Sequence, residues 1–169
     1  QASVREAVST MLVHSGDSHR FFVESLLQRL DPSDAEFLVA VSFLDALHPD
    51  LCRAITGRED SPEILERLCE LTPILTDAVD GSWLRLNALA REFLGEMFEA
   101  LPENDKRRYY GAAADWLASH GFHEEAARRA LSSGQDQLAL DLAERSLYDI
   151  YLTGQVSRIA QWLDRLPID

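Results

Sequence analysis

Apolar residues recur at helical spacing through the first third of the chain, and short polar segments interrupt them. At three of these interruptions a proline directly follows a polar residue: Asp31-Pro32, His48-Pro49 and Ser61-Pro62. Proline is favoured at the first helical position, where its missing N–H has no partner to lose, and Asp31 and Ser61 are residue types that cap free amides. The pattern predicts four helices, over residues 19–30, 32–44, 49–56 and 62–71.

The period of the pattern changes after Pro73. Residues 74–79 and 82–86 read as two short strands on either side of Asp80-Gly81, a strong two-residue hairpin signal. Beyond them, apolar residues return to helical spacing and predict a helix over residues 88–100. Helices followed by a hairpin and a further helix outline a winged-helix domain, which we assign to residues 19–101.

Residues 102–169 carry alanine-rich helical patterns and no strand signal. Gly121 interrupts one pair of predicted helices and Gly154 a second pair, at about the 33-residue spacing of tetratricopeptide-like repeats. Small alanines allow paired helices to approach closely, although the full repeat consensus is not met. We therefore predict a mainly α fold, with a winged-helix domain that has one β-hairpin, followed by about two tetratricopeptide-like antiparallel helical hairpins.

Residues 1–18 are expected to be a helical segment that belongs to a preceding domain. The chain begins with Gln-Ala-Ser and lacks the layout of a secretory signal, so we expect a cytoplasmic piece of a longer protein. Two helical repeats are fewer than the three or so that usually stand alone, which also suggests that the array continues. No apolar run is long enough to predict a transmembrane helix.

Charge argues against direct contact with nucleic acid or with an anionic membrane. The formal net charge is −13, and the predicted winged-helix half, residues 1–101, holds 8 basic and 18 acidic side chains. Its third helix, which reads DNA in many winged-helix proteins, carries three glutamates and a single arginine over residues 61–71. We interpret the winged helix as a module that contacts protein.

No pattern in the sequence indicates a catalytic centre, so we expect no enzyme activity and no metal or cofactor held by this stretch alone. Neither a glycine-rich phosphate loop nor a nucleophile elbow is present. Cys52 and Cys69 lie on apolar helical stretches and read as buried thiols. His120 and His123 lie close enough in sequence to hold a metal, but a loop between two helices explains them better.

Two further groups of residues have more than one interpretation. The basic clusters 106–108 and 128–129 offer a surface for a partner, but acidic neighbours favour local charge pairing. Trp116, Phe122 and Trp162 either line a ligand groove in the repeats or belong to the core, where large aromatics at helical spacing are common.

Four stretches, in order, carry a family resemblance: SGDSHRFFVESLLQRL, FLVAVSFLDALHPDLCRAITGR, LRLNALAREFL and AAADWLASHGFHEEAARRAL. Together they resemble the MalT-like large LuxR-type regulators, which are signal-transduction ATPases of the STAND class. In that family an ATPase core precedes a helical and winged-helix segment, a superhelical repeat sensor and a DNA-binding helix-turn-helix. The resemblance implies a regulator that rests with ADP bound, exchanges it for ATP when an inducer binds the repeats, self-associates and activates transcription.

The resemblance gives Asn87 a possible role. At the matching junction between the wing and the next helix, such proteins typically present a histidine to the β-phosphate of ADP. Asn87 is either the N-cap of helix 88–100 and nothing more, or a cap whose amide also donates to a phosphate oxygen. Asparagine cannot become cationic, so the departure from histidine puts tight retention of ADP in doubt.

We therefore expect a relay segment of an ATP-dependent LuxR-family activator, with ATP or ADP bound elsewhere in the parent protein. The expected partners are its own ATPase domain, further helical repeats, and an inducer that is a small molecule or a regulatory protein. The alternative is a free-standing helical-repeat adaptor that binds a protein or peptide. A phosphate-binding loop encoded upstream would favour the first.

Overall fold

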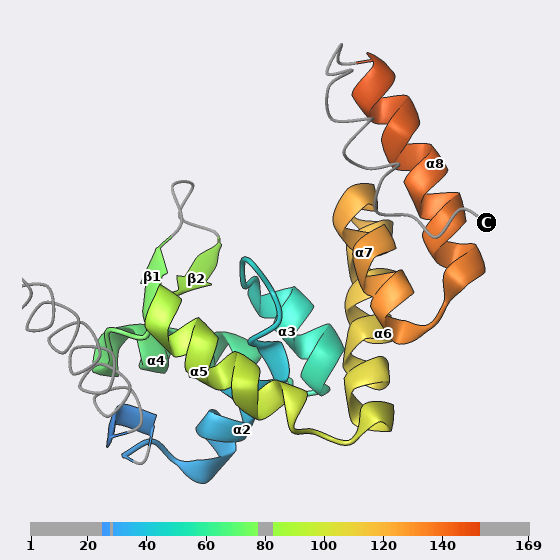
Figure 1. Ribbon diagram of the computed structural model, residues 1–169. Coiled ribbons are helices and arrows are strands. Elements are labelled where there is room, and N and C mark those ends of the chain that lie inside the picture. The colour runs from blue at the N-terminus through green and yellow to red at the C-terminus, as the bar shows by residue number, and fades with distance from the viewer. Residues whose placement is uncertain (1–24, 28, 78–82, 153–169) are drawn as a thin grey trace, which may run out of the picture. The chain divides into compact units, whose positions relative to one another are not determined.

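The computed structural model describes residues 25–27, 29–77 and 83–152 (Figure 1). By its internal contacts the chain divides into two compact units, Gln1–Leu101 and Pro102–Asp169. The predicted segment 1–18 lies outside the described residues. Each unit has its own core and is described by itself.

Three helices of the first unit have a predicted proline as their first or second residue. They are α2 (Pro32–Val41), α3 (Pro49–Thr56) and α4 (Ser61–Leu71). The Asp31 carboxylate accepts a hydrogen bond from the Ser33 amide and caps α2, as predicted. Ser61, in contrast, is not a cap, because it lies inside the first turn of α4 and its hydroxyl donates to the Arg58 carbonyl over 2.6 Å.

The second predicted helix is shorter than the apolar pattern indicates. Residues 25–27 are helical, and the earlier part of the predicted helix 19–30 lies outside the described residues. Helix α2 ends at Val41 instead of residue 44. The Ser42 hydroxyl donates to the Val39 carbonyl and, over 3.3 Å, to the Leu94 carbonyl of a later helix. This contact places the end of α2 against that helix.

The predicted hairpin forms with short strands, β1 (Leu75–Asp77) and β2 (Leu84–Leu86), paired antiparallel with Leu75 opposite Leu86. Its predicted turn lies outside the described residues. Leu47, before α3, adds a bridge to β2, and its amide and carbonyl both pair with Leu84, at 2.8 and 2.9 Å. No sequence pattern predicts this bridge. Helix α5 (Ala88–Glu99) follows β2 directly.

The core of the first unit contains side chains from α2, α3, α4, α5 and the small sheet. The largest fully buried side chains, by decreasing size, are Phe37, Phe98, Leu38, Leu47, Leu51, Ile64, Leu65, Leu68, Ile74, Leu94 and Val41. The Phe98 ring of α5 also contacts Phe43 at a centroid distance of 5.0 Å. Burial of this set against one another holds the hairpin and α5 on the helices.

The second unit contains α6 (Glu103–Ser119), α7 (His123–Ser133) and α8 (Asp136–Leu152). Helices α6 and α7 form the first predicted hairpin, and α8 packs against α7 (Figure 1). Gly121 and Gly134 adopt φ angles of +82° and +80° at the two turns, a conformation that favours glycine. The predicted partner of α8, from residue 156 on, lies outside the described residues.

Small residues line the contacts between these three helices. The fully buried alanines are Ala113 and Ala114 on α6, Ala126, Ala127 and Ala130 on α7, and Ala139 and Ala143 on α8. Gly111 of α6 approaches the start of α8 so closely that an added Cβ would lie 3.0 Å from the Gln135 side-chain nitrogen. The predicted fold class, a mainly α winged helix with one hairpin followed by helical hairpins, is confirmed.

Candidate functional site

The junction between the wing and α5 is built around Asn87. Its side-chain oxygen accepts a hydrogen bond from the Ala90 amide over 2.8 Å, which makes Asn87 the N-cap of α5. Its side-chain nitrogen donates to the Pro73 carbonyl over 2.9 Å, and its backbone amide donates to the Ile74 carbonyl over 2.8 Å. Asn87 therefore fixes the start of α5 to the segment that leads into β1.

This arrangement leaves limited donor capacity at the junction. An asparagine amide carries two N–H groups, and one of them is committed to Pro73. The first two amides of α5, those of Ala88 and Leu89, have no acceptor within the helix, and both residues are exposed. The junction can thus offer a few hydrogen-bond donors at the positive end of a helix dipole.

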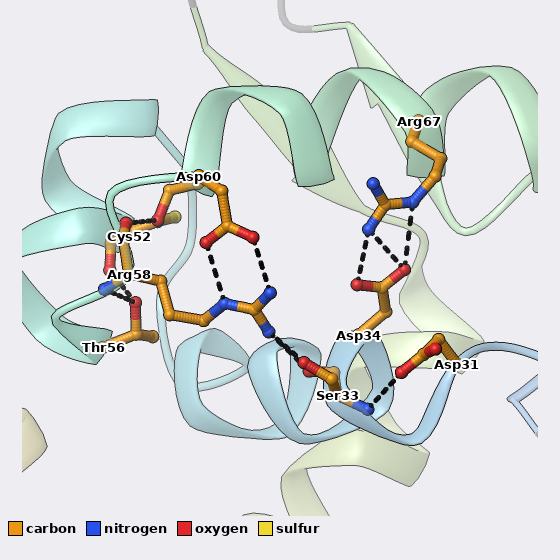
Figure 2. A network of polar contacts seen from close by, with 9 residues as sticks. Asp31, Ser33, Asp34, Cys52, Thr56, Arg58, Asp60 and Arg67 are labelled. Carbon is orange, nitrogen blue, oxygen red and sulfur yellow. Dashed lines mark hydrogen bonds and ion pairs between the residues drawn. The ribbon is translucent and has the colours of Figure 1, made fainter.

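Helix α4 is held against α2 by one ion pair (Figure 2). The Arg67 guanidinium donates to both carboxylate oxygens of Asp34, with Nη2 at 2.7 and 2.8 Å and Nε at 3.2 Å. The Asp34 side chain is 6% exposed, and these hydrogen bonds raise the pKa of Arg67 above its ordinary value. Arg67 is the one basic residue of α4, and its charge is committed to this contact.

A second arginine connects the loop between α3 and α4 to the start of α2 (Figure 2). Arg58 donates to both oxygens of Asp60, at 3.0 and 2.7 Å, and to the backbone carbonyl of Ser33 at 3.0 Å. The hydrogen bond from Arg58 lowers the pKa of the Asp60 carboxyl. Because the lower pKa belongs to the folded state, the pair stabilises the fold at neutral pH, and acid that titrates Asp60 removes that contribution.

The outer face of α4 is acidic. Glu63, Glu66 and Glu70 are exposed, and within the described residues none of these carboxylates forms an ion pair or hydrogen bond. In a winged helix that reads DNA through its third helix, this face would meet phosphates. The interpretation of the winged helix as a protein-contact module stays a prediction.

The basic clusters of the second unit are paired locally, as the sequence predicted. Lys106 lies 3.1 Å from Glu103, and Arg108 lies 3.5 Å from Asp105. On α7, Glu125 pairs with both Arg128 and Arg129. These pairs leave no concentrated basic surface on α6 or α7.

The aromatic residues at the α6–α7 turn are not core residues. The His120 ring stacks on Trp116 at a centroid distance of 3.8 Å, and its Nδ1 lies 2.8 Å from the Trp116 carbonyl. Phe122 is 44% exposed and lies parallel to Trp116 at 6.4 Å. His120 thus has a local structural role. Within the described residues, no group of three or more His, Cys, Asp or Glu side chains is placed to hold a metal ion. Trp162, the third aromatic residue of the predicted groove or core, lies outside the described residues.

The two cysteines differ in environment. Cys52 is fully buried, and burial raises the pKa of its thiol to about 12, while Cys69 is half-buried and so departs from the prediction of two buried thiols.

A thiol reagent is therefore expected to modify one cysteine quickly at pH 8, because only the thiolate reacts. Mass spectrometry should place the label on Cys69, and Cys69→Ser should abolish the fast phase. Rapid labelling of Cys52 in the folded chain would contradict the structure.

Comparison with known proteins shows which family and which proteins the chain is similar to. The model of the MalT winged helix domain matches residues 23–108. The HTH-type transcriptional regulator MalT of Vibrio parahaemolyticus is 27% identical over 152 residues, which cover 88% of this chain and 17% of that protein. The serine/threonine-protein kinase PknK of Mycobacterium tuberculosis is 25% identical over 150 residues, which cover 88% of this chain and 14% of that protein. The chain thus spans about a sixth of the length of these relatives.

Proposed function

Because the chain belongs to the MalT winged helix domain family, we propose that it is a relay segment of an ATP-dependent LuxR-type transcriptional activator. The winged helix contacts the ATPase domain of the same protein, and the second unit leads into further helical repeats that sense an inducer. We propose no catalytic step in this chain. It acts in the cytoplasm, where such a regulator meets its promoter. Family membership is the observation that carries it.

The structure supports the protein-contact role of the winged helix over a DNA-reading role. The third helix, α4, exposes three glutamates, and its single arginine is bound to Asp34. A free-standing adaptor would need only the helical hairpins, whereas the family match lies mainly on the winged helix. Within the described ranges, no helix is long and apolar enough to cross a membrane.

The chain is expected not to bind duplex DNA, because the acidic face of α4 repels phosphates. Fluorescence anisotropy with a labelled promoter duplex at near-physiological salt should give a dissociation constant weaker than about 10⁻⁴ M, the weak end of nonspecific binding. The same measurement at low salt checks for a purely electrostatic attraction. Micromolar binding that weakens steeply with salt would contradict the proposal.

In the full-length regulator, we propose that Asn87 also donates a hydrogen bond to a phosphate of bound ADP. The supporting observation is that the bond to Pro73 uses one of the two Asn87 amide N–H groups, and the first two amides of α5 have no acceptor within the helix. ADP, when bound, supplies the negative group that these donors meet. The residues fit such a secondary contact, and the rest of the nucleotide site belongs to the ATPase domain.

Asn87→His is expected to slow ADP release from the full-length regulator several-fold. A charge-assisted hydrogen bond is worth about 1 kcal/mol more than a neutral one, so the ADP-bound resting state becomes more stable. Basal transcription is therefore expected to fall. Asn87→Asp tests the opposite sign, because it keeps a capping oxygen and places a negative charge by the phosphate. If the release rate is unchanged in both variants while the melting temperature of Asn87→His falls, Asn87 is a helix cap only.

A further inference from the structure

Exposed apolar side chains lie on both sides of the Asn87 junction. Leu71, the last residue of α4, is 68% exposed, and Leu89, in the first turn of α5, is 42% exposed. Each is two residues away from one end of the 2.9 Å hydrogen bond between Asn87 and the Pro73 carbonyl. Pro73 itself is exposed. We call Leu71, Pro73 and Leu89 the leucine patch.

Leu71 of the leucine patch directly follows an acidic residue, Glu70, on α4. Glu63, Glu66 and Glu70 follow one another at helical spacing up to Leu71, and we call these three residues the acidic edge. Their mutual spacing of three and four residues places like charges side by side, which destabilises a helix. The acidic edge is therefore unfavourable for the isolated helix.

The acidic edge is also left without the cation that its own helix offers. Arg67 stands four residues after Glu63, the spacing at which Glu and Arg pair best on a helix. Its guanidinium instead binds Asp34 through both carboxylate oxygens. On α6 and α7, by contrast, Glu103, Asp105, Glu124 and Glu125 each lie within 4 Å of a basic side chain of their own helix.

We propose that the leucine patch and the acidic edge together bind a basic segment of a partner protein. An apolar side chain of that segment covers Leu71, and lysine or arginine side chains meet the carboxylates of the acidic edge. Apolar surface rimmed by charge is typical of protein-binding sites, and complementary charge favours a cationic occupant. The proposal is independent of the nucleotide contact at Asn87, because it uses the exposed surface of α4 and the first turn of α5.

The charge of the chain decides between possible occupants. Nucleic acid carries phosphates and is repelled by the acidic edge. A second copy of this chain brings a net charge of −13 and is repelled as well. A basic protein segment with an apolar anchor is the occupant that satisfies both features.

The test uses a synthetic amphipathic peptide that carries lysines at helical spacing and one leucine face, titrated against the whole chain by isothermal calorimetry. A second peptide has the same lysines with alanine in place of leucine. The chain should bind the leucine peptide roughly tenfold more tightly than the alanine peptide, because only the former covers the leucine patch. Leu71→Ala should remove most of this difference without lowering the melting temperature, since the side chain is exposed.

A matched pair of triple variants separates the acidic edge from the overall charge. The edge variant is Glu63→Gln, Glu66→Gln and Glu70→Gln. The control variant makes the same change in net charge at three separate exposed positions: Glu92→Gln, Asp115→Asn and Glu144→Gln. We expect the edge variant to weaken binding of the leucine peptide by roughly tenfold and the control by less than about twofold.

Three results would overturn the proposal. If both triple variants weaken binding equally, the peptide responds to the field of the whole chain and not to the acidic edge. If Leu71→Ala leaves the preference for the leucine peptide unchanged, the leucine patch has no part in binding. Concentration-dependent dimerisation by sedimentation, abolished by Leu71→Ala, would instead assign the patch to a second copy and would also refute the proposal.

Discussion

Replacement of Phe98 by alanine is expected to lower the free energy of unfolding of the first unit by roughly 3–5 kcal/mol, the usual cost of removing a buried phenyl ring from a core. Phe98 is 1% exposed on α5 and contacts Phe43. Since small domains are stable by only about 5–15 kcal/mol, the variant should be close to unfolding. Urea denaturation followed by circular dichroism measures the loss.

The neighbouring residue provides the control. Met97 precedes Phe98 on the same helix but is 44% exposed, so Met97→Ala should change the unfolding free energy by less than about 1 kcal/mol. Comparable losses in the two variants would show that α5 does not present the Phe98 face to the core. The packing of α5 against α2 that the structure shows would then be incorrect.

Ala127→Leu is expected to destabilise the second unit by about 1–3 kcal/mol. Ala127 is 1% exposed on α7, the helix that packs against both α6 and α8. Three added heavy atoms have no space between helices that approach through alanines, so side chains or backbone must shift. Thermal denaturation of the variant and of the unchanged chain should show the loss as a lower melting temperature.

Ser132→Leu is the matched control for this change. Ser132 lies on α7 as well but is exposed, and leucine is the better helix former, so this variant should be as stable as the unchanged chain or slightly more so. If Ala127→Leu is equally well tolerated, the close helix contact through alanines is not present.

Features of the fold that depend on local chemistry could be predicted from sequence. The prolines at positions 32, 49 and 62 locate the starts of α2, α3 and α4, because a proline near the first helical position is a local signal. The end of α2 could not be predicted. It depends on Ser42, whose hydroxyl bonds to Leu94, and that contact spans 52 residues of sequence.

Contacts between residues far apart in the sequence also account for the features of the candidate site that sequence patterns do not predict. The bridge between Leu47 and Leu84 has no sequence signal, since a single residue cannot show the alternation of a strand. The sequence shows Arg67 only as one of the charges of α4, because its pairing with Asp34 depends on how the fold brings α2 and α4 together. The capping role of Asn87 was predictable, because asparagine before a helical run is a local signal; its bond to Pro73 was not.

The central claim is that the winged helix responds to nucleotide state through protein contacts and does not read DNA. Hydrogen–deuterium exchange on the full-length regulator in its ADP-bound and ATP-bound forms, with and without promoter DNA, tests it most directly. We expect amide protection in α4 and the first turn of α5 to differ between the two nucleotide forms and to be unchanged by DNA. Protection of α4 by promoter DNA, with no difference between the ADP and ATP forms, would contradict the claim.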